Sequence, residues 1–323
     1  MADFEIGHSK VGLVLGAGGV MGGAWLVGAL HALVEETGWD PAEAELIVGT
    51  SAGAMIGALV AARVPTEFMV RHSAGEVVEG VTDAQGRPAS EASRSAGADF
   101  RLHRGLPRLG PGSPRLALAR GAPPGARLMA LVPRGLISTE PLKDTVRRAV
   151  AKGWADHKKL WVVATDYATG ERVAFGRRGA PPAELADAVA ASCAIPGFYH
   201  PVAIGGREYV DGGVSSTSNL DLAGGQGLDR VICLNPMSSR HRDSSLWLHR
   251  RLAARLRSLA GRQVGREAKL LRAQGTEVTI LQPTAEDLAV MGLNFMSGRR
   301  RHQVIETAVR TVGKQLSAVA AVG

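Results

Sequence analysis

Aromatic residues are scarce in this sequence. They make up 4% of the 323 residues, whereas 41 residues are glycine. The core is therefore expected to consist of Ala, Val, Leu and Gly, with close backbone packing. Cysteines are also few: Cys193 and Cys233 are too few for a disulfide framework or a cysteine-rich metal cluster. Each lies in an apolar run, so both are expected to be small buried side chains.

Long hydrophobic runs are absent as well. No stretch of about 18 uncharged apolar residues occurs, which argues against a membrane-spanning helix. The N-terminus, MADFEIGHSK, carries acids and lacks the apolar core of a signal peptide. We therefore expect a cytoplasmic protein. Acids are outnumbered, since 38 Lys and Arg face 30 Asp and Glu, and the resulting formal net charge of +8 favours anionic partners.

The stretch around which the chain is organised is 45–62, ELIVGTSAGAMIGALVAA. It predicts a short apolar strand, a sharp turn and a helix of small residues, the context in which a serine nucleophile is held on a strained turn. Gly49 and Gly53 flank Ser51 and would let the turn close and the helix pack against the strand. The helix would begin at Ala52 and point its free N–H groups at the place where an oxyanion forms.

A similar strand, turn and helix come earlier in the chain. Residues 11–15 form an apolar run, which the glycine-rich sequence GAGGVMGG (16–23) and a helical pattern ending near Gly38 follow. Two interpretations are open, a dinucleotide-binding turn of an oxidoreductase and an oxyanion loop. The dinucleotide fingerprint G-x-G-x-x-G requires glycine where Met21 stands. An oxyanion loop agrees better with the serine turn that comes next.

Residues 80–133 differ in composition, being rich in Gly, Pro, Ser and Arg. The segment is predicted to be mobile or loosely helical and to contribute nothing to the core. It is either a solvated insertion or a lid that faces lipid, because leucines are interleaved with its arginines. These leucines are Leu102, Leu106, Leu109, Leu116 and Leu118.

The remaining patterns alternate between helix and strand and include two hairpins. Helices are expected at 64–75, after Thr139 as N-cap to about Ala151, and at 182–191, 246–273 and 302–319; strands are expected at 160–165, 171–175, 201–204, 207–210, 231–234 and 277–282. This order predicts a three-layer α/β/α sandwich around a mostly parallel sheet. We expect one domain over 1–323, with its core at about 10–235 and a basic helical part at about 240–323.

The predicted helix 246–273 is strongly basic. On the face opposite its arginines recur Leu246, Leu248, Leu252, Leu256, Leu259 and Val264. The helix either covers the sheet, with its arginines in solvent, or docks on anionic lipid headgroups. Nucleic acid is not an expected partner, because aromatic residues that could stack on bases are nearly absent from the basic segments.

A serine nucleophile needs a base to accept its proton. Three histidines follow in the second half of the chain, at His241, His249 and His302. All three lie close to arginines, and none ends a strand beside a glycine turn, so none is predicted to be the base.

Asp211 is the better candidate for the base. It closes a predicted strand and precedes Gly212 and Gly213, so its carboxylate is expected at the C-terminal edge of the sheet, where Ser51 also lies. A carboxylate within hydrogen-bond reach of Ser51 would take its proton directly. On its own, without the serine turn, Asp-Gly-Gly is more typical of an ordinary turn than of a catalytic site.

Taken together, the motifs over about 10–223 resemble those of the patatin-like phospholipases. LVLGAGGVMGGAWLVGALHAL is similar to the first block of that family, GTSAG to its serine turn, and AVAASCAIPGFYHPVAIGGREYVDGGV to its third block. LISTEPL and ATDYATGERVAF resemble the connecting blocks.

This resemblance implies a serine acyl hydrolase of lipid esters that needs no metal or other cofactor. Ser51 would be the nucleophile and Asp211 the general base, and the N–H groups of Gly18, Gly19 and Ala52 would form the oxyanion hole. Six further glycines would support the motifs: Gly16, Gly22, Gly49, Gly53, Gly212 and Gly213. Peripheral contact with the anionic inner face of a membrane is also implied.

Two residues depart from the pattern of the family. Ala17 replaces a motif glycine, which is a small change. Met21 stands where the family usually carries Lys or Arg, so a positive charge that supports the oxyanion loop is missing. A lipid- or membrane-binding protein with weak or lost hydrolase activity therefore stays an alternative.

Overall fold

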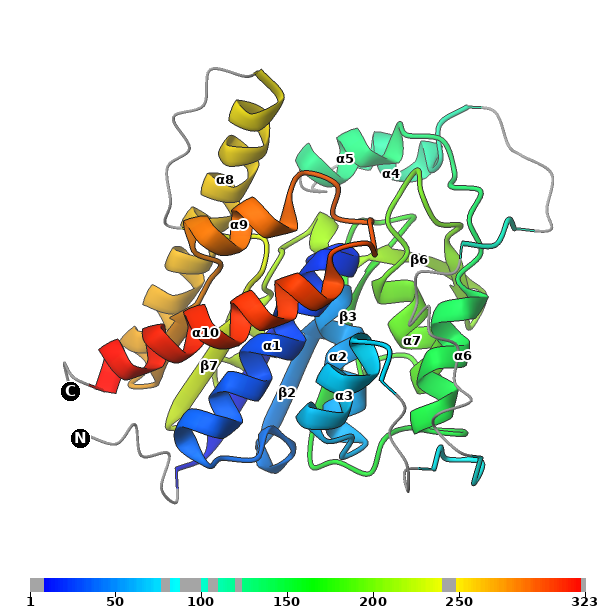
Figure 1. The fold of residues 1–323 in the computed structure, drawn as a ribbon. Coiled ribbons are helices and arrows are strands. Elements are labelled where there is room, and N and C mark those ends of the chain that lie inside the picture. The colour runs from blue at the N-terminus through cyan, green and yellow to red at the C-terminus, as the bar shows by residue number, and fades with distance from the viewer. Residues whose placement is uncertain are drawn as a thin grey trace.

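The computed structural model describes residues 9–76, 82–87, 100–103, 110–119, 124–239 and 248–320, which form one eight-stranded sheet flanked by helices (Figure 1). The order across the sheet is β5-β6-β3-β2-β1-β7-β8, and β4 pairs with β3. The strands are β1 (Val11–Leu15), β2 (Leu46–Thr50), β3 (Leu160–Asp166), β4 (Arg172–Phe175), β5 (Val202–Ile204), β6 (Arg207–Asp211), β7 (Arg230–Leu234) and β8 (Glu277–Leu281).

The two halves of the sheet differ in strand direction. Strands β3, β2, β1, β7 and β8 are parallel, whereas β4, β6 and β5 pair in antiparallel fashion beside β3. The helices are α1 (Gly19–Thr37), α2 (Ala52–Ala61), α3 (Thr66–Ser73), α4 (Pro114–Leu118), α5 (Pro124–Ala130), α6 (Glu140–Ala149), α7 (Leu185–Ser192), α8 (Leu248–Ala273), α9 (Ala285–Met291) and α10 (Arg301–Ala320). No helix in the described ranges is long and apolar enough to span a bilayer.

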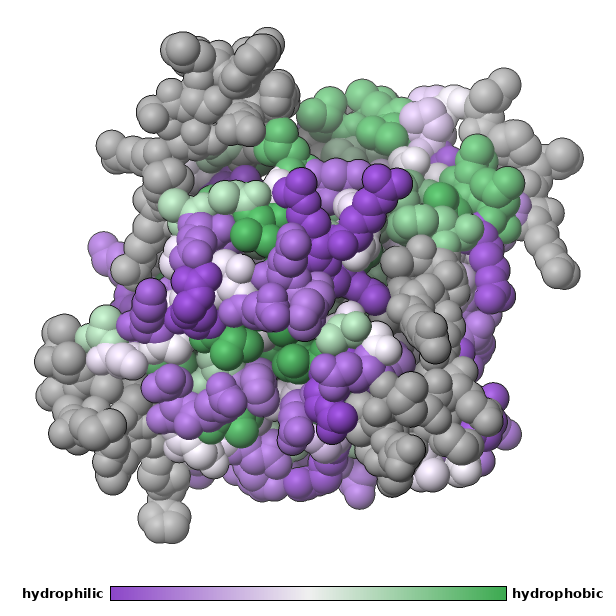
Figure 2. Space-filling view, in the orientation of Figure 1, coloured by the Kyte–Doolittle hydropathy of each residue, from purple (hydrophilic) through white to green (hydrophobic). Residues whose placement is uncertain are grey.

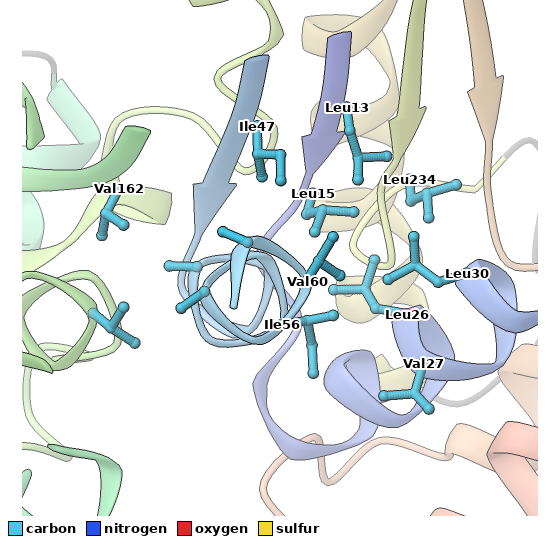
Figure 3. Close-up of a cluster of buried hydrophobic side chains, with 14 of the residues drawn as sticks. Leu13, Leu15, Leu26, Val27, Leu30, Ile47, Ile56, Val60, Val162 and Leu234 are labelled. Carbon is cyan, nitrogen blue, oxygen red and sulfur yellow. The ribbon is translucent and has the colours of Figure 1, made fainter. Parts of the chain in front are cut away.

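Alternate residues of the central strands point to opposite faces of the sheet, and each face has its own core. Leu13, Leu15 and Ile47 pack with residues of α1 and α2, such as Leu26, Leu30 and Val60, on the face that Figure 3 shows. Val14, Leu46 and Val48 pack on the other face with α8 residues. Because both faces are covered, these strands are unbroken apolar runs. The predicted three-layer α/β/α architecture is confirmed.

The inner face of α8 is not the one that its leucines predict. Leu256 and Leu259 are exposed, whereas the buried face consists of Ala260, Val264, Ala268 and Leu271. These positions follow one another at intervals of three or four residues and form one helical stripe. The stripe that contains the small alanine side chains is the buried one, because small side chains let the helix approach the sheet closely. The side chains of Leu246, Leu248 and Leu252 lie outside the described part.

A buried acid is also part of the inner face of α8. The carboxylate of Glu267 accepts hydrogen bonds from the hydroxyls of Ser216 and Ser218, at 2.8 and 2.6 Å, and from the N–H of Leu220 at 3.0 Å. These three donors replace the water that an exposed carboxylate would bind, so burial of the charge is tolerated.

Within 80–133, the described residues include the two short helices α4 and α5. The expectation that this segment contributes nothing to the core is wrong. Leu116 and Ala130 are buried against Tyr167 and Val210 in a small separate cluster. Leu106 and Leu109 lie outside the described residues.

Two smaller expectations have mixed outcomes. Cys193 and Cys233 are both buried, as predicted. Thr139 does precede α6, but its side chain makes no capping hydrogen bond. Instead, the hydroxyl of Ser138 accepts from the N–H of Glu140 at 3.2 Å.

Candidate active site

Ser51 lies on the turn between β2 and α2 in a backbone conformation that only glycine adopts easily. Its φ of 54° and ψ of −120° lie outside the ordinary regions for an L-residue. The N–H of Ser51 donates to the hydroxyl of Ser192 at 2.8 Å, and that hydroxyl donates to the carbonyl of Val163 at 2.5 Å. Ser192, at the end of α7, thus ties the strained turn to β3.

Two glycines beside Ser51 have no room for a side chain. A Cβ on Gly53 would overlap the carbonyl oxygen of Leu15, and one on Gly49 would come within 2.6 Å of the Cα of Ala54. The turn after β2 and the turn after β1 therefore touch backbone to backbone. The first turn of α2 can lie directly beside the end of β1 because of this contact.

Asp211 reaches Ser51 through the sheet. It ends β6, which pairs antiparallel with β3, and β3 pairs parallel with β2. Its buried carboxylate accepts a hydrogen bond from the N–H of Gly213 at 2.7 Å, and the nearby side chain of Ser51 lowers its pKa. Its own N–H donates to the carbonyl of Ala194 at 3.0 Å. Strand pairing therefore brings these two sequence-predicted residues together.

Burial changes the acidity of Asp211. Removal of the carboxylate from water raises its pKa to about 6, and the Ser51 side chain and the hydrogen bond from Gly213 oppose that rise. At neutral pH the group is still mostly ionised, so it can accept a proton. Its basicity is much greater than that of an exposed aspartate, which suits a general base that acts near pH 7.

The glycine-rich turn after β1 is anchored at several backbone positions. The N–H groups of Gly16 and Ala17 donate to the carbonyls of Leu234 and Thr217, at 2.9 and 2.8 Å, and that of Met21 donates to Phe295 at 3.0 Å. Among the described residues, none accepts from the N–H of Gly18, Gly19 or Ala52. These backbone donors are therefore available to a ligand at the start of the two helices.

A cavity of about 510 Å³ opens beside Ser51, within the size range of small-ligand sites. Gly19 and Ala52 line it together with Ser51, whereas Gly18 packs against Pro236. Most of the lining is apolar and comes from α1, α2, α3, α6 and the loop after α7, and includes Val27, Met55, Ile56, Leu59, Phe68 and Ile195. Such a lining suits a hydrocarbon chain.

Arginine and histidine side chains also line this cavity. They are Arg63, His72, Arg101, Arg148 and Arg301. Burial lowers the pKa of His72, and the charges of Arg301 and Arg148 lower it further, which indicates that these groups lie near one another. Two acids, Asp83 and Asp144, are part of the lining as well. The cavity therefore combines an apolar interior with a cluster of cations.

Neither Met21 nor His302 lines the cavity beside Ser51. The side chain of Met21 is buried in the core around α1. The exposed ring of His302 on α10 lies 3.0 Å from the carboxylate of Glu306. His241 and the side chain of His249 lie outside the described part. Nor do any three His, Cys, Asp or Glu side chains within that part form a group suited to a metal ion.

Sequence reasoning missed two parts of the site. Ser192 lies in the quoted stretch AVAASCAIPG, but no local pattern reveals that its hydroxyl holds the turn of a strand far away in the chain. Phe295 and Met296 lie still further along the chain, and their atoms are close to Gly19. Both contacts depend on how distant elements pack, so no motif could predict them.

One family model and one solved structure are similar to this chain. Residues 13–223, a range that contains Ser51 and Asp211, match the family model described as patatin-like phospholipase. Among solved structures, the chain is similar to the crystal structure of VipD from Legionella pneumophila, with 14% sequence identity and a TM-score of 0.41. That match covers 93% of this chain and 67% of the other.

Proposed function

The chain belongs to the patatin-like phospholipase family of lipid hydrolases, and from this premise we propose that it cleaves lipid acyl esters through a dyad of Ser51 and Asp211. One observation supports the dyad above all others. The buried carboxylate of Asp211 lies close enough to the side chain of Ser51 for that side chain to lower its pKa, and Ser51 is on a strained turn that faces an apolar cavity.

In the proposed first step, the hydroxyl oxygen of Ser51 attacks the ester carbonyl, and Asp211 takes the proton of that hydroxyl. The negative charge that develops on the carbonyl oxygen is stabilised by the N–H groups of Gly18, Gly19 and Ala52. Collapse of this intermediate breaks the ester bond, and the protonated Asp211 gives its proton to the leaving alcohol. An acyl group is then attached to Ser51.

In the second step, Asp211 takes a proton from water, and the resulting hydroxide attacks the acyl-enzyme carbonyl. The same N–H groups stabilise the second oxyanion. The bond between the acyl group and Ser51 then breaks, and Asp211 returns the proton to the oxygen of Ser51. The product is a free fatty acid. Both steps use one carboxylate as base and then as acid, which is why a pKa near neutrality is favourable.

The lining of the cavity supports a lipid with an anionic headgroup as substrate. The apolar side chains of α1, α2 and α3 would surround the acyl chain, while Arg148 and Arg301 would attract a phosphate. Phospholipids and lysophospholipids combine these two features. A panel of lipids read out by mass spectrometry would identify the headgroup and the chain that are cleaved.

Substitution of the two dyad residues tests the proposal. Ser51→Ala and Asp211→Asn are each expected to lower turnover of a short-chain p-nitrophenyl ester by about 100- to 10,000-fold or more, because each removes one partner of the proton transfer. Asp144→Asn is the matched control, since Asp144 is a carboxylate that lines the same cavity but pairs with Arg147. Circular dichroism verifies folding. Full turnover in either dyad variant would show that the proposed dyad is wrong.

Met21 favours one alternative, a lipid-binding member of the family with weak or lost activity. A fluorophosphonate probe distinguishes the two functions, because it reacts only with an activated serine. Labelling of the wild-type chain at Ser51, and its loss in Ser51→Ala, supports the hydrolase. If the wild-type chain stays unlabelled while lipid still binds, the binding function is correct.

A further inference from the structure

Large apolar side chains gather on one part of the surface, outside the cavity. Figure 2 shows hydrophobic surface over α4 and α5. The exposed fractions of these residues range from 44% to 80%, which is unusual for leucine and phenylalanine in a group. They are Phe100, Leu102, Leu118, Leu128, Leu131 and Leu136, and together they define what we call the apolar ridge.

The chain segment that carries the apolar ridge has charges of one sign. The sequence from residue 100 to 139 contains no Asp or Glu. Arg101, Arg115 and Arg127 are exposed next to ridge residues, while the nearby Arg134 is paired with Glu208 at 2.6 Å. Leucines beside arginines, without acids, are the composition of surfaces that insert into the interface of an anionic bilayer.

The underside of this surface is anchored to the core. Leu116 of α4 and Ala130 of α5 are buried against Tyr167 and Val210, and the hydroxyl of Ser113 donates to the carbonyl of Tyr167. The strand-like residues 101–103 are held by backbone hydrogen bonds between 101 and 138 at 2.7 Å and between 103 and 136 at 2.6 Å. The exposed leucines therefore project from a segment that is itself packed and hydrogen-bonded to the core.

The apolar ridge also adjoins the cavity. Arg101 lines the cavity and lies between Phe100 and Leu102 of the ridge. Leu102 pairs with Ile137, which pairs in turn with Tyr199, a lining residue. The ring of Phe100 contacts that of Phe198 with centroids 5.4 Å apart. A lipid surface in contact with the ridge would therefore lie beside the cavity.

A rival surface lies on α8. Leu256, Leu259 and Leu270 are 54–59% exposed, and arginines such as Arg262 flank them. This helix covers the sheet face opposite to α1 and α2, which line the cavity. A bilayer bound to these leucines would lie on the other side of the sheet from Ser51, so the ridge is the better placed of the two surfaces.

We propose that the apolar ridge docks on a lipid surface that contains anionic headgroups. Its leucines enter the interface, its arginines contact the headgroups, and the cavity is thereby held next to the membrane. This docking does not depend on the proposed hydrolysis, since it requires only the ridge. Binding and turnover are therefore separable in experiment.

Vesicle binding of the full chain tests the proposal. The Ser51→Ala background prevents lipid cleavage, and flotation with vesicles of phosphatidylcholine, with or without phosphatidylglycerol, measures partition. Exchange of Leu102, Leu118 and Leu128 for serine is expected to lower partition to the anionic vesicles by about tenfold or more, because three apolar side chains no longer enter the interface. The matched control exchanges Leu256, Leu259 and Leu270 for serine and is expected to leave partition within about twofold.

A charge variant sharpens the result. Replacement of Arg101, Arg115 and Arg127 by glutamine is expected to remove most of the preference for anionic vesicles and most of the dependence on salt. Because all substituted side chains are exposed, circular dichroism should show unchanged folding.

Three outcomes would overturn the proposal. The first is loss of binding in the α8 variant with retention in the ridge variant, which would assign docking to α8. The second is absence of vesicle binding by the parent chain. The third is sedimentation as a dimer that the ridge substitutions dissociate, without vesicle binding, which would make the ridge a contact with a second copy of this chain.

Discussion

Ser51 follows a strand on the parallel side of the sheet, whereas Asp211 ends a strand on the antiparallel side. Each residue is held in an unfavourable state, and the reason why that state costs free energy differs between them. Ser51 adopts a backbone conformation that disfavours any side chain, and the glycines around it make the turn tight. Asp211 has an ordinary backbone, but its carboxylate is buried and its pKa is raised. The cost is conformational at the serine and electrostatic at the aspartate. Each can therefore be changed without the other.

The largest effect should come from the tight backbone contact on the serine side. Gly53→Ala is expected to lower the free energy of unfolding by about 3 kcal/mol, because its Cβ would overlap the backbone of Leu15 and push α2 away from β1. Chemical denaturation measures the change. Gly265→Ala is the control: this helical glycine has open space around its Cβ position, so alanine should stabilise by about 0.5–1 kcal/mol. Equal stability of Gly53→Ala and wild type would contradict the close contact.

Acidity probes the aspartate side. Because the pKa of Asp211 is about 6, its base form is lost as the pH falls through that value. The kcat/KM for a neutral ester should therefore fall about tenfold per pH unit below pH 6, or about 100-fold at pH 4. An exposed aspartate would give this fall only near pH 4. Activity that stays constant down to pH 4.5 in a folded chain would contradict a buried base.

Removal of the buried charge should stabilise the fold while it removes activity. A raised pKa means that the folded chain holds the proton of Asp211 more tightly than the unfolded chain does, so ionisation between about pH 4 and pH 6 lowers stability. Asp211→Asn avoids this loss and should be more stable than wild type by about 1–3 kcal/mol at pH 7, with a smaller difference at pH 4. Thermal unfolding at the two pH values measures the difference. A variant that is less stable than wild type at pH 7 would mean that hydrogen bonds outweigh burial.

The smallest effect separates strain from chemistry at the serine. Ser51→Gly should be more stable than Ser51→Ala by about 1 kcal/mol, since glycine adopts a φ of 54° without strain. Ser317 on α10 provides the opposite case, because in a helix glycine should be less stable than alanine by about 1 kcal/mol. Denaturation of the four variants checks the reversal of sign. The same order at both positions would argue against strain at Ser51.

The two sides also differ in how well they were predictable. The turn at Ser51 could be predicted from consecutive residues, because its strand, tight glycine turn and helix are formed by neighbours in the chain. Asp211 could be placed at a sheet edge from its local pattern, but its contact with Ser51 depends on β6 pairing with β3. The resemblance to a family with this residue pair filled that gap.

Helix α8 shows where periodicity fails. Its leucines and Val264 were grouped on one face, yet Leu256 and Leu259 are exposed while Ala260 and Ala268 are buried. Several stripes of a helix can hold apolar residues, and the one that becomes buried is the one whose small side chains fit the sheet. The composition of 80–133 was equally misleading, because it predicted no buried residues there, whereas Leu116 is buried against Tyr167.

By itself, then, the sequence determined the order of the strands and helices, the strained serine turn and the glycine-rich turn before it, because these follow from interactions between near neighbours. The tertiary structure decided the rest. It brought Ser192 and Phe295 to the two turns, raised the pKa of Asp211 by burial, and left an apolar ridge exposed beside the cavity. Burial and contact between distant segments are properties of the packed chain, and no local pattern contains them.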